Sequence, residues 1–445
     1  MNPRLAAWRV LQQLERTPRH LEALLDQELS RHGSADPRAR AAACNLVYNV
    51  LRNRLLLDHR LRPFVNRPLD KLEGRVLWLL RLGAAELSLL GKPDHATVHA
   101  MVELAKGGPA GRAAGLVNGV LRALARGWRQ VALPAVANDP VEHLAVKYSH
   151  PGWITAELVR RLGVDQAELW LAANQQPPRL TLRVNPLRAT AQEVTGALQA
   201  RGLASRAHPL VDGALVVDSG GGPVWDLPGF ERGMYSAQDA GSQAVALLLG
   251  VGPGMRVLDL CAGAGGKTGA LAGLMQNQGE LLAVDSSAGR LEALADNLDR
   301  LGVGIVCRRR ADGTTLQGEG AFDRVLVDAP CTGLGTLGRR PDIRWRVGPQ
   351  DPERLARLQL RLARRAAELL RPGGAMLYAT CTITAAENQS VVRDLLAQRP
   401  DLRLDWGELP PALKACLEPD GFWRTTPHRH QCDAFFAARL VKTES

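Results

Sequence analysis

Apolar side chains in the first 130 residues recur at the spacing of one helix face. The pattern i, i+3, i+4, i+7 appears four times, at residues 7–14, 43–50, 98–105 and 117–124. Because a helical turn takes 3.6 residues, side chains at this spacing form a single apolar stripe that packs against other helices. Four such stripes predict a small all-α bundle at the N-terminus.

The pattern becomes mixed after the bundle. Prolines mark residues 133–140 as a linker and residues 175–178 as a second break. Residues 180–184 then alternate like a strand, residues 191–201 are typical of a helix, and residues 214–217 form a short apolar run. These elements predict a small α+β module.

From Gly254 onward, short apolar segments alternate regularly with helical ones. We predict helices at residues 287–301 and 352–370, and strands at residues 256–260, 281–285, 304–308, 324–328 and 375–381. Strand–helix alternation implies right-handed crossovers and a largely parallel sheet with helices on both faces, an α/β Rossmann-like fold. Such sheets bind ligands at the carboxyl ends of their strands.

Length and composition agree with a multidomain chain. At roughly 100–200 residues per domain, 445 residues correspond to about three domains, and 46% hydrophobic residues suffice for their cores. We expect a helical domain at 1–132, the α+β module at 140–240 and the α/β domain at 241–445.

The positive charge lies mostly in the N-terminal segment. Residues 1–130 carry 21 Lys and Arg against 11 Asp and Glu, residues 131–240 carry 9 against 11, and residues 241–445 carry 26 against 23. The formal net charge of +11 therefore divides as +10, −2 and +3. A basic module beside nearly neutral ones indicates that one part attracts a polyanion, with a merely solvated basic surface as the alternative. The arginines expected to project from the bundle toward phosphates are Arg38, Arg40, Arg52, Arg54, Arg60 and Arg62.

The sequence predicts no membrane span, no disulfide framework and no structural metal site. No apolar run approaches the roughly 20 residues that span a bilayer, and residues 1–9 lack the apolar segment of a signal peptide, so we expect a cytoplasmic protein. The seven cysteines are scattered and include no CxxC pair, which predicts neither a disulfide framework nor a zinc site.

The first strand of the α/β domain leads into a glycine-rich turn. Residues 261–267 read Cys-Ala-Gly-Ala-Gly-Gly-Lys before a helix, so the backbone can pass close to a ligand and helix N–H groups are available. Asp285 ends the second strand, 20 residues after Gly265, where a carboxylate can accept hydrogen bonds from a ribose diol. Together they indicate an adenosine-bearing cofactor.

Two further carboxylates bear on which cofactor this is. Asp312 follows the third strand, within reach of an adenine amino group, and Asp328 ends the fourth. NAD is one candidate, but the turn lacks the G-x-G-x-x-G pattern and added negative charge would repel a pyrophosphate. The set fits S-adenosylmethionine better, although Asp312, in Ala-Asp-Gly, could be only a turn former.

Cys331 and Cys381 follow strands at the same predicted edge, whereas we interpret Cys44, Cys307, Cys416 and Cys432 as inert buried residues. A thiolate beside a methyl donor has a specific use, because its addition to carbon 6 of a cytosine turns carbon 5 into an enamine carbon that accepts a methyl group. A carboxyl near ring nitrogen 3 stabilises the charge that develops, and a base must remove the carbon 5 proton before the thiolate leaves.

At these residues the sequence resembles the RNA (cytosine-5) methyltransferases. The resemblance is specifically to the bacterial family of small-subunit ribosomal RNA methyltransferases B, also called Sun or Fmu. The similar segments are residues 235–240, 259–267, 328–331 continuing through 339–345, and 378–381. Residues 115–122 resemble the RNA-binding NusB-like domain of that family. The resemblance implies a NusB-like helical domain, a small α+β linker or RNA-binding module and a methyltransferase domain.

The resemblance also implies a role for each site residue. Cys381 would be the covalent nucleophile, Cys331 would assist elimination and product release, Asp328 would lie near ring nitrogen 3, and Lys267 near the cofactor or base. In DNA cytosine-5 methyltransferases the Pro-Cys cysteine is the nucleophile, so the presence of both cysteines favours the RNA class. S-adenosylmethionine, without a metal, would be held by Cys261, Ala262, Gly263, Ala264, Gly265, Gly266, Lys267, Asp285, Asp312 and Asp328.

The sequence departs from the family pattern at three places. Gly263 and Ala264 replace the usual alanine and proline, which loosens the turn, and Thr382 replaces serine while keeping the hydroxyl. Ala434 replaces a glycine near the C-terminus, which puts backbone contacts there in doubt.

The expected partner is 16S ribosomal RNA, free or in a pre-ribosomal small subunit, and we expect the protein to act as a monomer. Arg339, Arg340, Arg344 and Arg346 would grip phosphates and Trp345 would stack on a base, with a structural arginine cluster as the alternative. A non-catalytic RNA-binding assembly factor is a competing hypothesis, which the intact site residues disfavour. Transfer RNA is another candidate substrate, which the N-terminal bundle disfavours.

Overall fold

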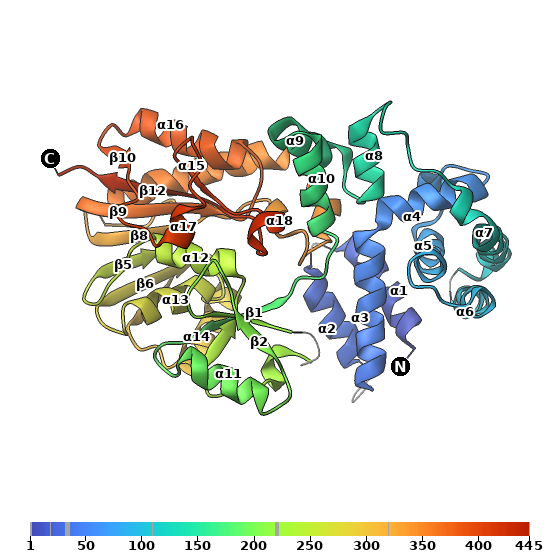
Figure 1. Cartoon of the computed structure of the whole chain (residues 1–445), viewed down its shortest axis with the longest axis horizontal. Helices are drawn as coiled ribbons and strands as arrows, with labels where there is room; N and C mark the ends of the chain where they lie inside the picture. The colour runs from blue at the N-terminus through green and yellow to red at the C-terminus, as the bar shows by residue number, and fades with distance from the viewer. Residues whose placement is uncertain are drawn as a thin grey trace. The chain divides into compact units, whose positions relative to one another are not determined.

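The computed structural model describes residues 2–17, 19–31, 36–108, 110–218, 222–318 and 320–444. The chain forms two compact units (Figure 1). The first comprises Met1–Gln175 together with Arg340–Arg346, and the second comprises Gln176–Arg339 together with Val347–Ser445.

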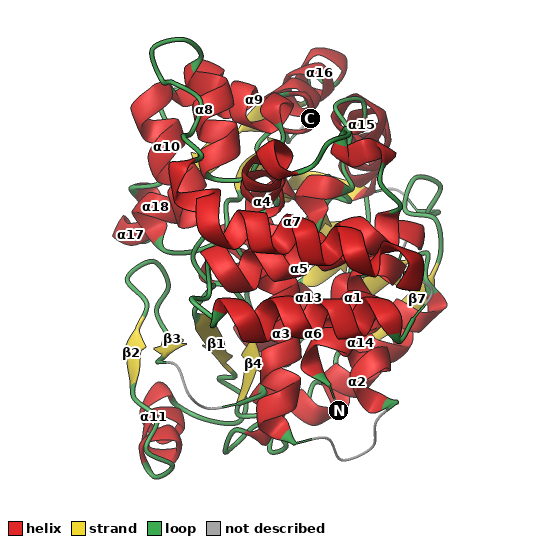
Figure 2. Ribbon diagram, turned by 90° about the vertical axis from the view of Figure 1, so that its right-hand side faces the viewer, coloured by secondary structure: helices red, strands yellow, loops and turns green. Residues whose placement is uncertain are grey.

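The first unit is built from helices. They are α1 (Pro3–Arg16), α2 (Leu21–Ser30), α3 (Pro37–Arg52), α4 (Arg54–Leu61), α5 (Gly74–Ser88), α6 (Asp94–Lys106), α7 (Ala114–Gly127), α8 (Pro140–Lys147), α9 (Gly152–Leu162) and α10 (Val164–Ala173). Helix α1 packs against α3 and α5, and α6 packs against α5 and α7 (Figure 2). The side chains of all four predicted stripes lie in one core, so the all-α bundle is confirmed.

Several of its arginines do not project toward solvent as predicted. Arg52 is 9% exposed, and the guanidinium of Arg54 lies over the rings of Trp78 and Trp345. Arg60 lies over Trp128 and donates a hydrogen bond to Ser88, whereas Arg38 and Arg62 are exposed. The prediction is wrong for Arg52, which is buried, because arginine stems and guanidinium planes pack on aromatic rings. Arg54 and Arg60 are half-buried by the same kind of packing.

The segment Arg340–Arg346 is embedded in this helical unit. Arg344 is fully buried, and its Nη1 donates to the backbone carbonyls of Ser149 at 3.0 Å and Arg52 at 3.3 Å. Trp345 packs on the helical core and donates from Nε1 to the carbonyl of Leu51 at 2.7 Å. The prediction that Arg344 grips a phosphate is therefore wrong, since its guanidinium is fully buried. Trp345 is half-buried, and its stacking on a base stays a prediction.

The second unit begins with a small antiparallel sheet. Its elements are β1 (Leu180–Val184), α11 (Ala191–Gln199), β2 (Ser205–Ala207), β3 (Ala214–Val217) and β4 (Tyr235–Ala237). The strand order is β2-β3-β1-β4, and α11 packs on β2 and β3. The predicted α+β elements are present, while the segment 140–240 as a whole spans both units, because α8, α9 and α10 belong to the helical one.

A larger sheet forms the rest of the second unit. Its strands are β5 (Arg256–Asp259), β6 (Glu280–Asp285), β7 (Val306–Arg310), β8 (Phe322–Asp328), β9 (Leu370–Thr380), β10 (Leu402–Leu404), β11 (Trp423–Arg424) and β12 (Phe436–Lys442). The order is β10-β12-β9-β8-β5-β6-β7, with β11 paired to β12. Strands β5 to β9 are parallel, whereas β10, β11 and β12 pair antiparallel.

Helices cover both faces of this sheet. They are α12 (Ala240–Leu248), α13 (Gly266–Leu274), α14 (Ala288–Leu301), α15 (Asp351–Leu369), α16 (Val391–Gln398), α17 (Pro411–Lys414) and α18 (Pro427–His430). Val257 and Leu326 share a core with α12 and α13, while Leu258 and Val325 share one with α15 and α16, as strand alternation requires. The predicted parallel α/β sheet is confirmed, although β7 starts two residues later than expected.

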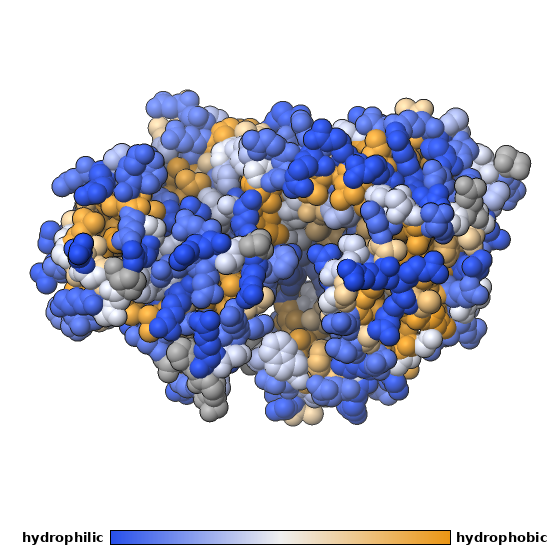
Figure 3. All heavy atoms as spheres, turned by 180° about the vertical axis from the view of Figure 1, so that it is seen from behind, coloured by the Kyte–Doolittle hydropathy of each residue, from blue (hydrophilic) through white to orange (hydrophobic). Residues whose placement is uncertain are grey.

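Hydrophilic side chains cover much of the molecular face in Figure 3, with smaller apolar patches between them. Within the described ranges, no helix is long and apolar enough to cross a membrane.

Candidate active site

Cys331 and Cys381 meet at the carboxyl ends of two neighbouring parallel strands. Strand β8 ends at Asp328, which lies opposite Ala379 of β9, and each cysteine follows its strand within three residues. Their sulfurs are 3.4 Å apart, within hydrogen-bond distance for two thiol groups. The structure therefore brings the two sequence-predicted cysteines into one site.

Two thiols this close cannot both be ionised, because like charges oppose each other. The hydrogen bond with Cys381, burial, and the charges of Cys381 and Glu387 raise the pKa of the Cys331 thiol well above its ordinary value. The raised pKa favours a protonated Cys331, whose sulfur lies within hydrogen-bond distance of the sulfur of Cys381.

Lys267 lies beside this pair and is bound to Asp328. Its Nζ is 2.6 Å from Oδ2 of Asp328 and 5.3 Å from the centre of the Phe435 ring. Burial lowers the pKa of Lys267, but the charge and hydrogen bond of Asp328, with smaller contributions from Cys381 and Asp259, raise it overall. Lys267 therefore stays charged at neutral pH, and Asp328 keeps 30% of its side chain exposed.

The glycine-rich turn between β5 and α13 is closed on one side and open on the other. The N–H of Gly263 donates to Oδ2 of Asp285 at 3.0 Å, and the N–H of Ser287 donates to Oδ1 at 2.8 Å. Gly263 and Gly265 have φ values of +56° and +83°, where glycine is favoured. A Cβ at Gly265 would lie 2.8 Å from Leu294, whereas one at Gly263 would meet no described atom within 4 Å. The open side is where a ligand would lie.

Asp259 was part of the glycine-rich motif but was not among the predicted site residues. It is 1% exposed, its Oδ2 accepts a hydrogen bond from Thr268 at 2.8 Å, and its Oδ1 has no partner among the described residues. Burial raises the pKa of Asp259 to about 7 despite the hydrogen bond from Thr268. An orphaned carboxyl oxygen beside an open turn suits a polar group of a bound cofactor, so these residues fit an adenosine-bearing molecule.

The remaining predicted residues near the turn take different positions. Burial and the charges of nearby carboxylates raise the pKa of the Cys261 thiol far above its ordinary value, so Cys261 contributes backbone and packing rather than a nucleophile. Asp312 is exposed, and its Oδ1 accepts from the N–H and hydroxyl of Thr314 at 2.9 and 2.8 Å, which lowers the pKa of Asp312. Its side chain therefore forms a turn, as the alternative interpretation proposed, and its part in cofactor binding stays a prediction.

The structure brings in Glu387, which no sequence signal marked. It lies in the π-helical turn Ala386–Ser390 after the Cys381 loop and is fully buried. Its carboxylate accepts hydrogen bonds from Thr332 and Thr382, the residues that follow the two cysteines. Because these partners lie in separate loops, neither spacing nor periodicity along the chain could have identified Glu387.

Arg339 and Ala434 lie beside the cysteine loops. Arg339 donates to Asp239 at 3.1 Å and to Asp433 at 3.2 Å, so it is held by two carboxylates rather than free for a phosphate, contrary to its predicted role. The N–H of Ala434 donates to the carbonyl of Gly335 at 2.9 Å, and Ala434 is not one of the residues with positive φ. An alanine therefore fits without strain where the family pattern has glycine.

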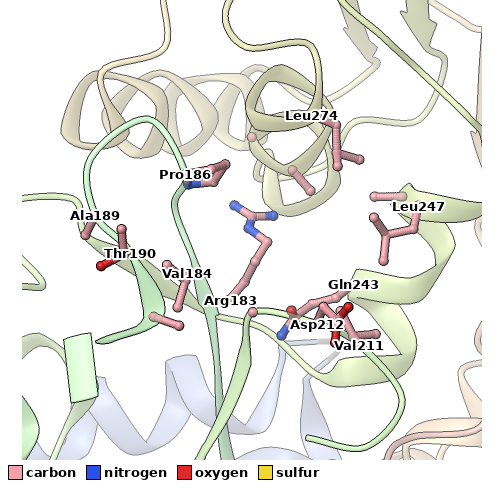
Figure 4. Close-up of a pocket in the computed structure, with 15 residues that line it drawn as sticks. Arg183, Val184, Pro186, Ala189, Thr190, Val211, Asp212, Gln243, Leu247 and Leu274 are labelled. Carbon is pink, nitrogen blue, oxygen red and sulfur yellow. The ribbon is translucent and has the colours of Figure 1, made fainter. Parts of the chain in front are cut away.

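A separate pocket lies between the small sheet and helices α12 and α13 (Figure 4). Arg183 extends into it from β1, beside the apolar side chains of Leu247 and Leu274. Nη1 of Arg183 donates to Oε1 of Gln238 at 2.6 Å and also to the carbonyl of Gly266. Since Gly266 begins α13, Arg183 fastens the glycine-rich turn to the small sheet.

The fold and these residues together indicate a methyltransferase: a parallel α/β sheet, a nucleotide-type turn with a carboxylate at the next strand end, and two adjacent thiols at the same edge. Residues 246–441 match the model of the 16S rRNA methyltransferase RsmB/F family, residues 1–126 that of the NusB family, and residues 150–224 that of the RsmF/B-like ferredoxin-like domain. The chain belongs to the RsmB/F family of S-adenosylmethionine-dependent rRNA methyltransferases.

Relatives match over most of the chain. Ribosomal RNA small subunit methyltransferase B of Xanthomonas campestris is 34% identical over 99% of this chain and 97% of its own. The protein of the same name from Salmonella enteritidis is 32% identical over 89% of both. The crystal structure of PH0851 covers 99% of both chains at 26% identity with a TM-score of 0.82. Among the described residues, no group of His, Cys, Asp or Glu side chains is arranged to hold a metal ion.

Proposed function

We propose that this enzyme methylates carbon 5 of a cytosine in 16S ribosomal RNA through a covalent bond between Cys381 and carbon 6. The observation that supports it most is the pair of sulfurs 3.4 Å apart beside the Lys267–Asp328 ion pair. A methyltransferase acting on oxygen or an exocyclic nitrogen needs no such pair, whereas carbon 5 of cytosine must first be activated by a nucleophile. The names of full-length relatives support small-subunit ribosomal RNA as the substrate.

The cofactor would lie on the open side of the glycine-rich turn. Residues 261–266 would face it with backbone, Asp285 would accept hydrogen bonds from its ribose, and Asp312 would approach its adenine. S-adenosylmethionine supplies an electrophilic methyl group when bound. The orphaned Oδ1 of Asp259 adds one acceptor to the predicted set.

The two cysteines then divide the work. The charge of Lys267 interacts electrostatically with Cys381 and favours its thiolate, which attacks carbon 6, while the carboxyl of Asp328 would face ring nitrogen 3. After methylation a base takes the carbon 5 proton, and the bond between carbon 6 and sulfur breaks. The S–H group of Cys331 stabilises the leaving thiolate by hydrogen bonding, because the two sulfurs already lie 3.4 Å apart in the free enzyme.

Substitution of each cysteine tests this division. Cys381→Ala should abolish methyl transfer without forming a protein–RNA adduct. Cys331→Ala should accumulate an adduct that survives a denaturing gel, because the leaving thiolate loses its hydrogen-bond donor. An inactive Cys331→Ala without an adduct, together with an active Cys381→Ala, would mean that the roles are reversed.

The substrate is tested by bisulfite sequencing, which detects 5-methylcytosine, on ribosomal and transfer RNA from a strain lacking the gene. One 16S position should lose its methylation, and the purified enzyme should restore it on either naked RNA or the assembling small subunit. An unchanged 16S methylation map would contradict the proposal. Loss of methylation confined to transfer RNA would show that transfer RNA is the substrate instead.

A further inference from the structure

Glu387 is a buried carboxylate whose hydrogen bonds connect the two cysteine loops. Oε1 accepts from the N–H of Thr332 at 2.8 Å and from Nε2 of Gln359 at 3.1 Å. Oε2 accepts from the hydroxyls of Thr332 at 2.6 Å, Thr384 at 2.8 Å and Thr382 at 3.2 Å. All of these donors are neutral, so they compensate the buried charge by hydrogen bonding alone.

Two of these hydrogen-bond partners lie next to the cysteines of the proposed reaction. Thr332 follows Cys331, and Thr382 follows Cys381, so one carboxylate holds the residue next to each reactive sulfur. The hydroxyls of Thr332 and Thr382 are themselves 2.6 Å apart, so the proton of Thr382 is shared between the Thr332 oxygen and Oε2 of Glu387. The loops come from different strands, β8 and β9, and are 50 residues apart in sequence at this contact. The distance between the sulfurs therefore depends on contacts made outside the sheet.

Glu387 is in turn fixed by groups that do not touch the substrate site. The hydroxyl of Tyr378 donates to the backbone carbonyl of Glu387 at 2.5 Å, and its oxygen also lies 3.2 Å from Oε1 of Gln359. Gln359, on α15, also donates to the carbonyl of Pro330, the residue before Cys331. The network therefore reaches the Cys331 loop from both sides of the cysteine.

We propose that Glu387 is a positioning residue that holds the two cysteines in contact by binding Thr332 and Thr382. This role rests on the proposed function, because it matters only if both thiols take part in the reaction. Glu387 acts through the threonines and does not itself contact the base. Removing it should let the loops separate, so that Cys331 no longer reaches the leaving thiolate.

The conservative variant Glu387→Gln can keep this geometry. The donors on Oε1 are an N–H and an amide, which need an acceptor, and an amide oxygen provides one. The donors on Oε2 are hydroxyls, which can turn to accept from the new NH₂ group. Glu387→Gln should therefore restore much of what Glu387→Ala loses.

The decisive readout is the distance between the thiols, measured without RNA. Dibromobimane becomes fluorescent when it bridges two neighbouring thiols, and mass spectrometry identifies the bridged cysteines. Wild-type enzyme and Glu387→Gln should bridge Cys331 to Cys381, whereas Glu387→Ala should bridge them at less than about a third of that rate. The exposed Glu353→Ala on α15 is the matched control and should bridge like the wild type.

Kinetics give the second readout. Glu387→Ala should lower kcat about 100-fold or more, since displacement of a catalytic group by about 1 Å has such an effect, while KM for S-adenosylmethionine stays within about twofold. Thr332→Val, which removes only a hydroxyl, serves if Glu387→Ala does not fold, and should reduce both bridging and kcat in the same direction. Unchanged bridging in Glu387→Ala and Thr332→Val, or a Glu387→Gln as defective as Glu387→Ala, would overturn the proposal. If the wild type bridges but methylates no cytosine, the proposed function fails while the bridging assay still tests the role of Glu387.

Discussion

At the scale of single residues, the burial of Asp259 beside the predicted cofactor site makes the stability of the fold depend on pH. The carboxyl is buried at the end of β5, and the pKa of about 7 in the folded protein compares with an ordinary value of 3.8. The folded state therefore binds the Asp259 proton more tightly than the unfolded chain does. Below about pH 4 the group costs nothing, between about pH 4 and 7 it becomes increasingly destabilising as pH rises, and above about pH 7 the penalty is constant.

Asp259→Asn should remove this pH-dependent penalty. A shift of about three pKa units corresponds to about 4 kcal/mol. Between about pH 4.5 and 7.5, the free energy of unfolding should therefore fall by about 2–4 kcal/mol more in the wild type than in the variant. Urea unfolding at both pH values measures it, with the exposed Asp296→Asn on α14 as control. Parallel pH dependence in Asp259→Asn and wild type would contradict the raised pKa.

How far single residues could be predicted depended on whether they share a motif. Cys331 and Cys381 were placed by strand ends, and the structure puts their sulfurs in contact. Glu387 and Thr332 were not found, because their hydrogen bond joins residues 55 apart in the chain through loop geometry. Polar partners of this kind have no periodicity, since only the folded backbone brings them together.

At the scale of elements, the segment Arg340–Arg346 packs in a different unit from the residues before and after it in the sequence. It follows the Cys331 loop, yet it is built into the helical unit. Burial and the charge of Arg52 lower the pKa of Arg344 to about 9, and its Nη1 donates to the carbonyl of Ser149. Arg344 thus satisfies backbone carbonyls that would otherwise be buried without a donor.

Arg344→Met should therefore destabilise the helical unit although it keeps an apolar stem of similar length. The lost charged donor leaves buried carbonyls unsatisfied, for which we expect about 2–4 kcal/mol in the free energy of unfolding. Chemical denaturation followed by helix circular dichroism gives the value. Arg364→Met, at an exposed position of α15, is the control, and equal stability of the two variants would disprove the role of Arg344.

The regular elements were predictable where hydrophobic periodicity was strong, and their tertiary environment was not. The strand at residues 214–217 has the predicted bounds, and α14 begins one residue after the predicted start. The same sequence gave no sign that Trp345 would pack into a helical core. Tryptophan and arginine suit both RNA binding and burial, so composition alone could not distinguish the two.

At the scale of the whole molecule, charge is distributed unevenly along the chain. The N-terminal 130 residues hold 21 Lys and Arg against 11 Asp and Glu, whereas residues 241–445 hold 26 against 23. The burial of Arg52 and the stacking of Arg54 and Arg60 remove part of this surplus from the surface. The remaining exposed arginines and lysines must carry any attraction of the helical unit for RNA phosphates.

Two sets of three exposed arginines allow the contribution of each unit to RNA binding to be measured. The helical set, from the first unit, is Arg112, Arg122 and Arg126. The catalytic set, on α15 of the unit that contains the candidate active site, is Arg357, Arg361 and Arg364. If the helical unit docks the RNA, changing the helical set to Gln should weaken binding and lower the slope of log affinity against log salt by about 2, at about 0.7 per lost phosphate contact. The same change in the catalytic set removes equal charge and should lower the slope by less than about 1. Filter binding of a 16S fragment over a salt series measures both slopes. Equal slopes for the two variants would show that overall charge, and not the helical unit, attracts the RNA.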